Sequence, residues 1–370
     1  MEMRTAKKLG IETSLLGFGC MRLPQKDGVI DYAETERMLD AAYDAGVNYF
    51  DTAYVYHGGK SEGVMGPILK KHPRESYYVA DKMPVWLPRT RDDLEHIFNE
   101  HLERLGLDYI DFYLMHSITV EHWADVKRLD MLRFAEEKRA QGKIRYIGFS
   151  FHDTPELFRE ILDAYDWDFA QIQYNYLDEK DQRAGELYDL LEQRGLFTVV
   201  MEPVRGGDLA ALPEAAAAPL RAADPGRSPA SWALRFVGSR PGVNVILSGM
   251  SDPGQVRDNL QTFSQFEPLD ERERAALTQT VAQLEHIPHI ACTGCRYCMP
   301  CPAGVDIPGN FDFYNGFQRF GANTGRVRRW GMLDKKYDAC VECGACLSKC
   351  PQHLAIPEEL KKLADVAAAL

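Results

Sequence analysis

Short apolar runs alternate with amphipathic stretches along most of this 370-residue chain. Apolar positions within 91–105 recur at helical spacing, which predicts a helix there. The stretch 155–165 repeats that pattern behind Thr154, a suitable helix cap, and Pro155, which suits a first helical turn. The apolar runs themselves have the length of buried strands. There are eight of them: 14–19, 47–50, 77–80, 109–115, 144–149, 169–174, 197–201 and 243–248.

Eight strand–helix units over about 250 residues predict an α/β fold of the (β/α)8 TIM barrel type. A doubly wound sheet is the alternative, but no G-x-G-x-x-G follows the first strand, which disfavours a Rossmann cofactor site. The Ala- and Pro-rich segment 213–229 predicts a loop or short helix after the seventh strand. Segments 255–262 and 271–286 predict helices that close the barrel. A change of composition then places a domain boundary near residue 287, with a barrel over 1–286 and a small domain over 287–370.

Composition and charge narrow the range of functions. Apolar residues make up 45% of the chain and charged residues 26%, which is an ordinary globular balance. The net charge of -12 argues against nucleic-acid binding, because neutralising phosphates needs clustered Lys and Arg. One basic stretch, 326–336, lies close in sequence to several phenylalanines, and we interpret it as a solvated face or a docking patch for an acidic protein.

The cysteines indicate a metal site. No secretory signal or membrane-spanning run is recognisable, so we expect a cytoplasmic protein, in which disulfides are rare. Eight of the nine cysteines nevertheless lie in the last 79 residues, and only Cys20 lies elsewhere. Such clustering in a cytosolic protein favours metal binding over disulfide bridges.

Chargeable side chains lie just past three successive strands, at Asp51, Lys82 and His116, and Tyr56 is on the loop after the first of them. The carboxyl ends of barrel strands share one mouth, where active sites are built, so we expect these four side chains to meet. They suit carbonyl reduction. Tyr56 would donate the proton, with its pKa lowered by the ammonium of Lys82. Asp51 would orient Lys82, and His116 would donate a hydrogen bond to the substrate oxygen.

Seven motifs support the same interpretation, in order over nearly all of residues 10–260. They are GFGCMRLP (17–24), FDTAYVYHGGKSE (50–62), VADK (79–82), DFYLMH (111–116), GKIRYIGFS (142–150), QIQYN (171–175) and SDPGQVRDN (251–259). On these residues the chain resembles the aldo/keto reductase family. The resemblance implies a (β/α)8 barrel that binds NADPH in an extended pose. It also implies a catalytic tetrad of Asp51, Tyr56, Lys82 and His116.

The resemblance further implies seven cofactor contacts: Cys20, Met21 and Met201 near the nicotinamide, Ser150 and Gln171 at its carboxamide, and Gln255 and Asn259 at the adenosine end. Two of these positions depart from the family pattern. Met201 stands where an aromatic ring often stacks on the nicotinamide, and Gln255 where an Arg often holds the 2′-phosphate. A neutral amide supplies no charge-assisted contact, so NADP(H) and NAD(H) both stay open. The candidates to replace the missing charge are Arg205, Arg227 and Arg257.

The cysteine spacing predicts iron–sulfur clusters. CVECGACLSKCP (340–351) has the C-x2-C-x2-C-x3-C-P spacing of bacterial ferredoxins, in which the fourth cysteine serves the other cluster. CTGCRYCMPCP (292–302) is a near repeat with a shorter last gap. Two [4Fe-4S] clusters follow if the halves exchange their fourth ligands, with Cys292, Cys295, Cys298 and Cys350 at one, and Cys340, Cys343, Cys346 and Cys301 at the other. The short gap and the 38 residues between Cys301 and Cys340 keep one cluster as an alternative. Zinc is a further alternative.

Together these features predict an NAD(P)H-dependent oxidoreductase that reduces a small-molecule carbonyl, or oxidises an alcohol in reverse, with a ferredoxin-like 4Fe-4S domain attached. The alternatives are an electron-transfer protein whose barrel docks a redox partner, and a reductase with purely structural clusters. Hydride transfer moves two electrons and each cluster moves one. No flavin site is recognisable, so a partner protein or a further cofactor must bridge the two steps if the clusters are redox-active. The substrate stays open, with Trp86, Trp123 and Phe151 as candidate pocket walls.

Overall fold

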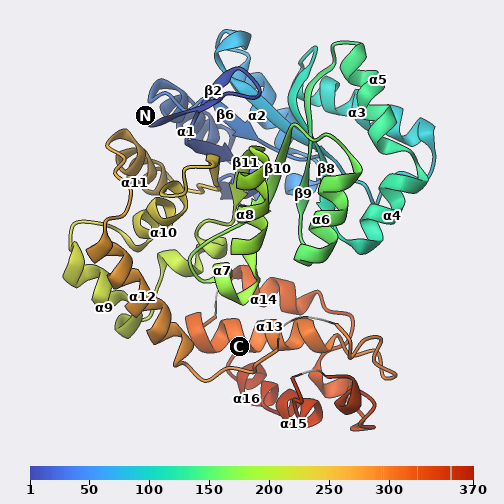
Figure 1. Ribbon diagram of the computed structural model, residues 1–370, viewed down its shortest axis with the longest axis vertical. Helices are drawn as coiled ribbons and strands as arrows, with labels where there is room; N and C mark the ends of the chain where they lie inside the picture. Colours follow the sequence, from blue (N-terminus) through green and yellow to red (C-terminus); the bar gives the residue numbers. More distant parts are fainter. Residues whose placement is uncertain (293, 295, 323, 351) are drawn as a thin grey trace. The chain divides into compact units, whose positions relative to one another are not determined.

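A computed structural model describes residues 1–292, 294, 296–322, 324–350 and 352–370 (Figure 1). Its central feature is a closed barrel of eight parallel strands in the order β10-β11-β12-β3-β6-β7-β8-β9. Each of the eight apolar runs contributes one strand, so the predicted fold class is confirmed. The strands are β3 (Leu16–Gly19), β6 (Tyr49–Asp51), β7 (Tyr78–Met83), β8 (Ile110–Ile118), β9 (Ile144–Phe151), β10 (Phe169–Gln173), β11 (Phe197–Met201) and β12 (Val243–Ser248).

Helices connect and surround these strands. Local signals fix their ends: Thr90 and Asp93 form a capping box at the start of α3, and the Thr154 side chain caps α6 directly before Pro155. Both helices predicted from apolar stripes are therefore confirmed. Two small hairpins, β1 (Met3–Ala6) with β2 (Ile11–Ser14) and β4 (Gln25–Lys26) with β5 (Val29–Ile30), accompany the barrel. The helices are α1 (Tyr32–Asp44), α2 (Ser61–Leu69), α3 (Arg91–Leu105), α4 (Val120–Arg128), α5 (Met131–Ala140), α6 (Pro155–Ala164), α7 (Asp178–Asp181), α8 (Ala184–Arg194), α10 (Pro229–Gly238) and α11 (Pro253–Ser264).

A glycine lets α2 and α3 approach each other closely. A Cβ atom on Gly66 of α2 would lie 2.2 Å from the carbonyl oxygen of Leu105 on α3, so a larger side chain has no room there. The close approach brings the polar residues Glu62 of α2 and His101 of α3 into contact, and both side chains are fully buried.

The second compact unit comprises residues 206–229 and 270–370. Its helix α9 confirms the short helix predicted within 213–229. Helix α12 was expected to close the barrel. Instead it packs on α9, where the Thr280 hydroxyl donates to the carbonyl oxygen of Ala216 at 2.9 Å. The boundary near residue 287 stays a prediction. The helices of this unit are α9 (Glu214–Ala223), α12 (Glu271–Glu285), α13 (Ile307–Phe320), α14 (Thr324–Gly331), α15 (Ile356–Lys361) and α16 (Leu363–Ala368).

The basic stretch 326–336 contributes to the apolar core of this unit. Trp330 stacks on Phe313 with ring centroids 4.4 Å apart. Arg326 is only 4% exposed and forms an ion pair with Asp208. The interpretation of this stretch as a solvated face is therefore wrong for these two residues, which hold the unit together.

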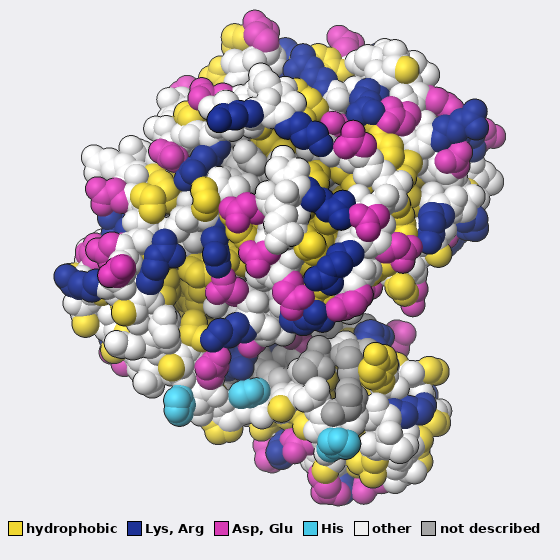
Figure 2. All heavy atoms as spheres, in the orientation of Figure 1, with side chains coloured by type: hydrophobic (Ala, Val, Ile, Leu, Met, Phe, Trp, Pro, Cys, Tyr) yellow, Lys and Arg dark blue, Asp and Glu magenta, His cyan; other side chains and the backbone are white. Residues whose placement is uncertain are grey.

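The surface carries mixed charges on the face shown in Figure 2, where acidic and basic side chains are interspersed. Opposite charges at neighbouring positions give no large field of one sign on this face. None of the helices in the described part of the chain is long and apolar enough to cross a membrane.

Candidate functional site

Adjacent parallel strands bring three of the four predicted tetrad residues to one edge of the barrel. Asp51 ends β6, Lys82 lies on β7 and His116 lies on β8. The strand registers pair Asp51 with Ala80 and Lys82 with Leu114, so the polar residues follow one another around the carboxyl edge. Tyr56 lies on the single helical turn Tyr56–Gly58 that follows β6.

The four side chains are within reach of one another. The Lys82 ammonium donates to Asp51 Oδ1 at 2.6 Å and to the carbonyl oxygen of Thr52 at 2.5 Å. Its Nζ atom lies 5.0 Å from the centre of the Tyr56 ring. The rings of Tyr56 and His116 meet edge to face, with centroids 6.0 Å apart. The structure thus brings together the residues that the sequence selected.

Burial controls the protonation of these groups. It raises the pKa of Tyr56 to about 12, although the charge of Lys82 lowers it. The expectation that Lys82 would bring this pKa down is therefore wrong for the net shift, because desolvation outweighs the charge. Tyr56 keeps its proton at neutral pH, as a proton donor must. Burial lowers the pKa of His116 well below its usual value, and Lys82 adds to the effect, so this ring is neutral.

Lys82 stays an ammonium in spite of complete burial. Desolvation would lower its pKa, but the charge of Asp51 and the hydrogen bond to it oppose desolvation, and the net shift of the Lys82 pKa is upward. For Asp51, burial raises the pKa and Lys82 opposes the increase. The two groups therefore depend on each other for their charges.

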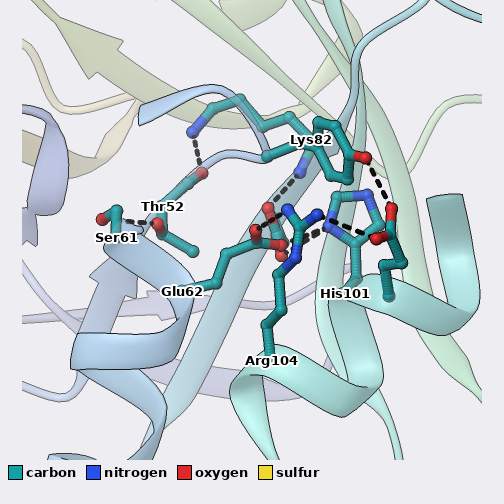
Figure 3. A network of polar contacts seen from close by, with 9 residues as sticks. Thr52, Ser61, Glu62, Lys82, His101 and Arg104 are labelled. Carbon is teal, nitrogen blue, oxygen red and sulfur yellow. Dashed lines mark hydrogen bonds and ion pairs between the residues drawn. The ribbon is translucent and has the colours of Figure 1, made fainter. Parts of the chain in front are cut away.

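A chain of buried charges lies behind Lys82, between β7 and the helices α2 and α3 (Figure 3). His101 Nδ1 is 2.6 Å from Glu62 Oε1 and 3.0 Å from Asp81 Oδ2. The other oxygen of Asp81 accepts from the backbone N–H of Lys82 at 2.8 Å. Arg104 donates to Glu62 Oε2 at 3.0 Å.

Sequence reasoning missed this network, although a signal was present. His101 falls on the apolar stripe of 91–105, three residues after Phe98 and four before Leu105, and all three are buried. A histidine on the buried face of a helix needs a polar partner. That partner comes from β7 and α2, and no local pattern reveals which strand residue meets which helix.

Three of the implied cofactor contacts lie on neighbouring strands. Gln171 on β10 is in register with Ser150 on β9, and its Nε2 atom lies 3.3 Å from the sulfur of Met201 at the end of β11. The Oε1 atom of Gln171 is buried with no hydrogen-bond partner among the described residues. An unpaired buried acceptor is costly. An amide N–H, such as that of a nicotinamide carboxamide, fits this position.

The remaining implied contacts differ in their burial and in their hydrogen bonds. Asn259 on α11 is buried and donates to the Ser248 hydroxyl at 2.8 Å. Gln255 on the first turn of α11 accepts from the backbone of Ser251 at 2.8 Å. Cys20 is fully buried near the charges of Asp51 and Lys82, whereas the side chain of the next residue, Met21, is 54% exposed.

The candidate phosphate ligands also differ in their surroundings. Arg205 pairs with Asp178 at 3.1 Å and Arg227 with Asp224 at 3.0 Å. Arg257 is exposed at the start of the second turn of α11, two residues after Gln255. A helix N-terminus favours anions, so Arg257 is the best placed of the three for a phosphate.

Only one of the three candidate pocket walls lies beside the tetrad. The ring of Trp86 is 5.2 Å from that of His116 and stacks on His122 at 5.3 Å. Trp123 and Phe151 are buried, at 3% and 1% exposure, and belong to the packing around the barrel. Their burial favours the alternative that they are plain packing, and a role as pocket walls stays a prediction.

The C-terminal cysteines gather around two neighbouring hollows. Cys292, Cys298 and Cys350 line the first with Phe311 and Ile356. The second is lined by Cys301, Cys340, Cys343 and Cys346. Each hollow thus takes one cysteine from the other run, the arrangement that ligand exchange requires. Cys295, the remaining expected ligand, lies outside the described residues.

The cysteine hollows suit iron–sulfur clusters. Thiolate sulfurs are the ligands that such clusters use. The backbone N–H of Gly294 donates to Cys292 Sγ at 3.4 Å, the kind of contact that stabilises a thiolate. Ile307, at the start of α13, lines both hollows. Cys298 is buried, at 8% exposure, whereas Cys343 in the second hollow is exposed.

Comparisons with known proteins agree with this arrangement. The model of the aldo/keto reductase family matches residues 15–282, and that of the 4Fe-4S dicluster domain matches residues 291–355. L-galactose dehydrogenase of Arabidopsis thaliana is 25% identical over 310 residues, covering 78% of this chain and 96% of that protein. NADH-specific methylglyoxal reductase of Escherichia coli (strain K12) is 28% identical over 225 residues, covering 55% and 65%. The solved holo form of an aldo-keto reductase from Bacillus halodurans aligns with a TM-score of 0.64 at 28% identity, covering 76% of this chain and 96% of that one.

Proposed function

The chain belongs to the aldo/keto reductase family, and we propose that it uses NAD(P)H to reduce a small-molecule carbonyl, or catalyses the reverse alcohol oxidation. The observation that carries this proposal is the buried Lys82–Asp51 ion pair beside Tyr56 and His116. A buried ammonium next to a protonated phenol is an arrangement for delivering one proton to an oxygen that gains negative charge.

The proton comes from Tyr56. Reduced nicotinamide supplies the hydride when it is bound. The Tyr56 hydroxyl gives its proton to the carbonyl oxygen, and the Lys82 ammonium stabilises the phenolate that remains. Asp51 holds Lys82 in place through its 2.6 Å hydrogen bond. The neutral His116 donates a hydrogen bond to the same substrate oxygen and thereby binds and orients the carbonyl.

The cofactor would lie across the ends of β9, β10 and β11 and the start of α11. Gln171 and Ser150 would hold the carboxamide, and Met201 would pack against the ring. Cys20 and Met21 would approach the nicotinamide from the strand end at β3, and Gln255 and Asn259 would contact the adenosine. Arg257 would hold a 2′-phosphate, so we propose NADPH as the preferred cofactor. The pattern that supports this preference is the exposed Arg257 at a helix N-terminus.

The C-terminal 4Fe-4S domain would hold two clusters. One would be bound by Cys292, Cys295, Cys298 and Cys350, and the other by Cys340, Cys343, Cys346 and Cys301. The two hollows support this assignment because each already gathers cysteines from both runs. The ligands would bind the clusters as thiolates.

A second function, electron exchange with a partner protein, is favoured by one observation. Cys343 is exposed, and its neighbours Val341 and Leu347 are also exposed although they are apolar, at 69% and 45%. An exposed cluster edge with apolar neighbours is suited to contact a redox protein. The notion that the barrel itself docks the partner has no such observation behind it, and the remaining alternative is a reductase whose clusters are purely structural.

Carbonyl reduction can be tested directly with protein purified without oxygen. Oxidation of NADPH and of NADH would be followed with methylglyoxal and with 4-nitrobenzaldehyde. Tyr56→Phe is expected to lower kcat/KM at least about 100-fold, because it removes the proton donor. Tyr49→Phe, the matched control, removes a buried hydroxyl without a partner among the described residues and should leave kcat/KM unchanged. Equal rates for Tyr56→Phe and the parent would contradict the proposal.

A further inference from the structure

Three fully buried ionisable side chains lie behind Lys82, and one of them, Asp81, is its neighbour on β7. His101 Nδ1 lies between two carboxylates, 2.6 Å from Glu62 Oε1 and 3.0 Å from Asp81 Oδ2 (Figure 3). None of the three has any exposed side-chain surface. The proposed mechanism does not use them, and burying charged groups costs several kcal/mol per ion unless they are paired. Their presence therefore needs an explanation.

The alternation of strand side chains explains the position of this cluster. Neighbouring residues of a strand point to opposite faces, so Lys82 faces the barrel mouth and Asp81 faces the helices. Asp81 is nevertheless bonded to its neighbour, because its Oδ1 accepts from the Lys82 backbone N–H at 2.8 Å. Any movement of the Asp81 carboxylate is transmitted to the main chain of Lys82.

The charges alternate outward from the tetrad. Lys82 is followed by Asp81, His101, Glu62 and Arg104, and Arg104 donates to Glu62 Oε2 at 3.0 Å. Burial would lower the pKa of His101, but Asp81 and Glu62 outweigh it and raise this pKa to about 9. An imidazolium ion at this position balances one of the two negative charges, and Arg104 supplies the second positive charge at Glu62.

The other groups that face His101 are few. The rings of Tyr54 and Tyr113 contact it edge to face, at 5.4 and 5.7 Å. Its Nε2 atom is buried with no partner among the described residues, and this feature and the burial of the ring both favour the neutral form. With Asp81 from β7, Glu62 from α2 and Arg104 from its own helix, these groups define the electrostatic environment of His101.

Metal binding is the rival explanation, because the candidate ligand atoms of Glu62, Asp81 and His101 lie within 4.8 Å of one another. The existing bonds disfavour it. Arg104 already places a positive charge on the second oxygen of Glu62. The 2.6 Å contact of His101 Nδ1 with Glu62 Oε1 is a hydrogen bond, and Asp81 Oδ2, which has no hydrogen bond among the described residues, lies 3.0 Å from the same nitrogen as an ion-pair partner. A divalent cation would add charge beside the guanidinium.

We propose that Asp81, His101 and Glu62 form a positioning relay. The protonated imidazole of His101 fixes the Asp81 carboxylate behind Lys82. That carboxylate in turn sets the position and the charge of Lys82 in the tetrad. The inference rests on the proposed function for its catalytic consequence, but not for the existence of the relay. Asp81 also acts on Tyr56: burial is the main cause that raises the pKa of this phenol, and the Asp81 charge adds to it. Asp81 therefore adds to the effect of burial, which is what keeps Tyr56 protonated.

The existence of the relay is tested in the unmodified protein by NMR of 15N-labelled histidine, with His101 assigned from His101→Gln. We expect the 15N chemical shifts of His101 to be those of an imidazolium ion at pH 7.5 and to change with a midpoint near pH 9. A signal that titrates below pH 7 would overturn the relay, whether or not the protein turns over any carbonyl. So would a stoichiometric divalent metal other than iron that is absent from Asp81→Asn.

Its action on the tetrad is tested by NMR of tyrosine labelled with 13C at Cζ, with Tyr56 assigned from Tyr56→Phe. Asp81→Asn removes one negative charge, so Tyr56 should begin to titrate about half a pH unit or more lower than in the parent. The matched control is Asp111→Asn, since Asp111 is a buried carboxylate on the next strand that pairs with Arg74 and Arg145. Equal titration in the two variants would overturn the positioning role.

Turnover gives a separate readout. With methylglyoxal as the probe, the pH at which kcat/KM falls on the alkaline side should move down in Asp81→Asn and stay in place in Asp111→Asn. If Asp81 had a purely structural role, kcat/KM would fall in both variants but the pH at which it falls on the alkaline side would not change. Failure of the parent to reduce any carbonyl would contradict the proposed function alone, because the two NMR titrations still decide on the relay.

Discussion

The ammonium of Lys82 and the carboxylate of Asp51 form a 2.6 Å ion pair that is closed to solvent, at the ends of two adjacent parallel strands. Neither charge is stable there alone, because burial opposes both ionised forms. The pair is therefore the point at which the stability of the barrel and its proposed chemistry are most directly linked.

Removing one partner of this pair should cost more stability than removing both. We expect Lys82→Met to lower the free energy of unfolding by about 3 kcal/mol, because Asp51 is left buried and uncompensated. The double variant Lys82→Met/Asp51→Leu should recover most of that loss. Both should be inactive, since neither retains the ammonium. Urea unfolding of the three proteins tests the stability, and a double variant that is less stable than the single one would contradict the interpretation.

The fold was predictable because its signal is local. The eight apolar runs of the sequence became the eight barrel strands, and the Thr154–Pro155 pair became a helix start. The meeting of the four predicted tetrad residues was predictable for a related reason. The carboxyl ends of parallel strands lie at one edge of a barrel, so residues at or just past the ends of neighbouring strands come close together, independent of loop conformation.

Tertiary contacts set the limits of that prediction. The Glu62–His101–Asp81 cluster depends on the depth at which α2 and α3 approach, which Gly66 allows, and no local pattern encodes it. Arg326 looked like a surface charge in a basic run, but Asp208, more than a hundred residues earlier, pairs with it. The direction of the pKa shift of Tyr56 was missed because it depends on how completely the phenol is buried.

The stability of the protein should fall as the pH rises through the alkaline range. The folded pKa of His101, about 9, lies above its ordinary value of 6.5, so its proton stabilises the fold fully below 6.5 and this contribution is lost as the pH rises through 9. The loss should be on the order of 3 kcal/mol. Burial also raises the pKa of Glu62, to about 7, which adds a loss of the same sign between about 4.5 and 7.

Urea unfolding between pH 6.5 and 9.5 measures this dependence, with His101→Gln as the comparison. The variant should be less stable at pH 6.5 but should lose much less between the two pH values. If the free energy of unfolding fell by the same amount with pH in both proteins, His101 would not bind its proton more tightly in the folded form than in the unfolded form.

The exchange of cysteine ligands between the two runs predicts a specific pattern of iron contents. The parent should hold about eight irons per chain, with matching acid-labile sulfide. Cys298→Ser/Cys350→Ser removes two ligands from one hollow and should leave about four irons. Cys346→Ser/Cys350→Ser affects both hollows and should leave almost none. Cys20→Ser is the control that keeps the full content. Four irons in the Cys346/Cys350 variant would mean that each run binds its own cluster.

Cofactor preference should depend on Arg257. In the proposed pose its guanidinium meets the 2′-phosphate of NADPH at the start of α11, and NADH has no such group. Arg257→Ala should therefore raise KM for NADPH about tenfold or more and leave KM for NADH unchanged, because a lost charge-assisted contact is worth more than about 1 kcal/mol. Arg128→Ala, which removes an exposed arginine paired with Asp125 on α4, should change neither value. Steady-state kinetics with both cofactors and methylglyoxal measure these constants. Equal increases for NADPH and NADH would assign Arg257 to the shared part of the cofactor, and no increase for either would exclude it from the binding site.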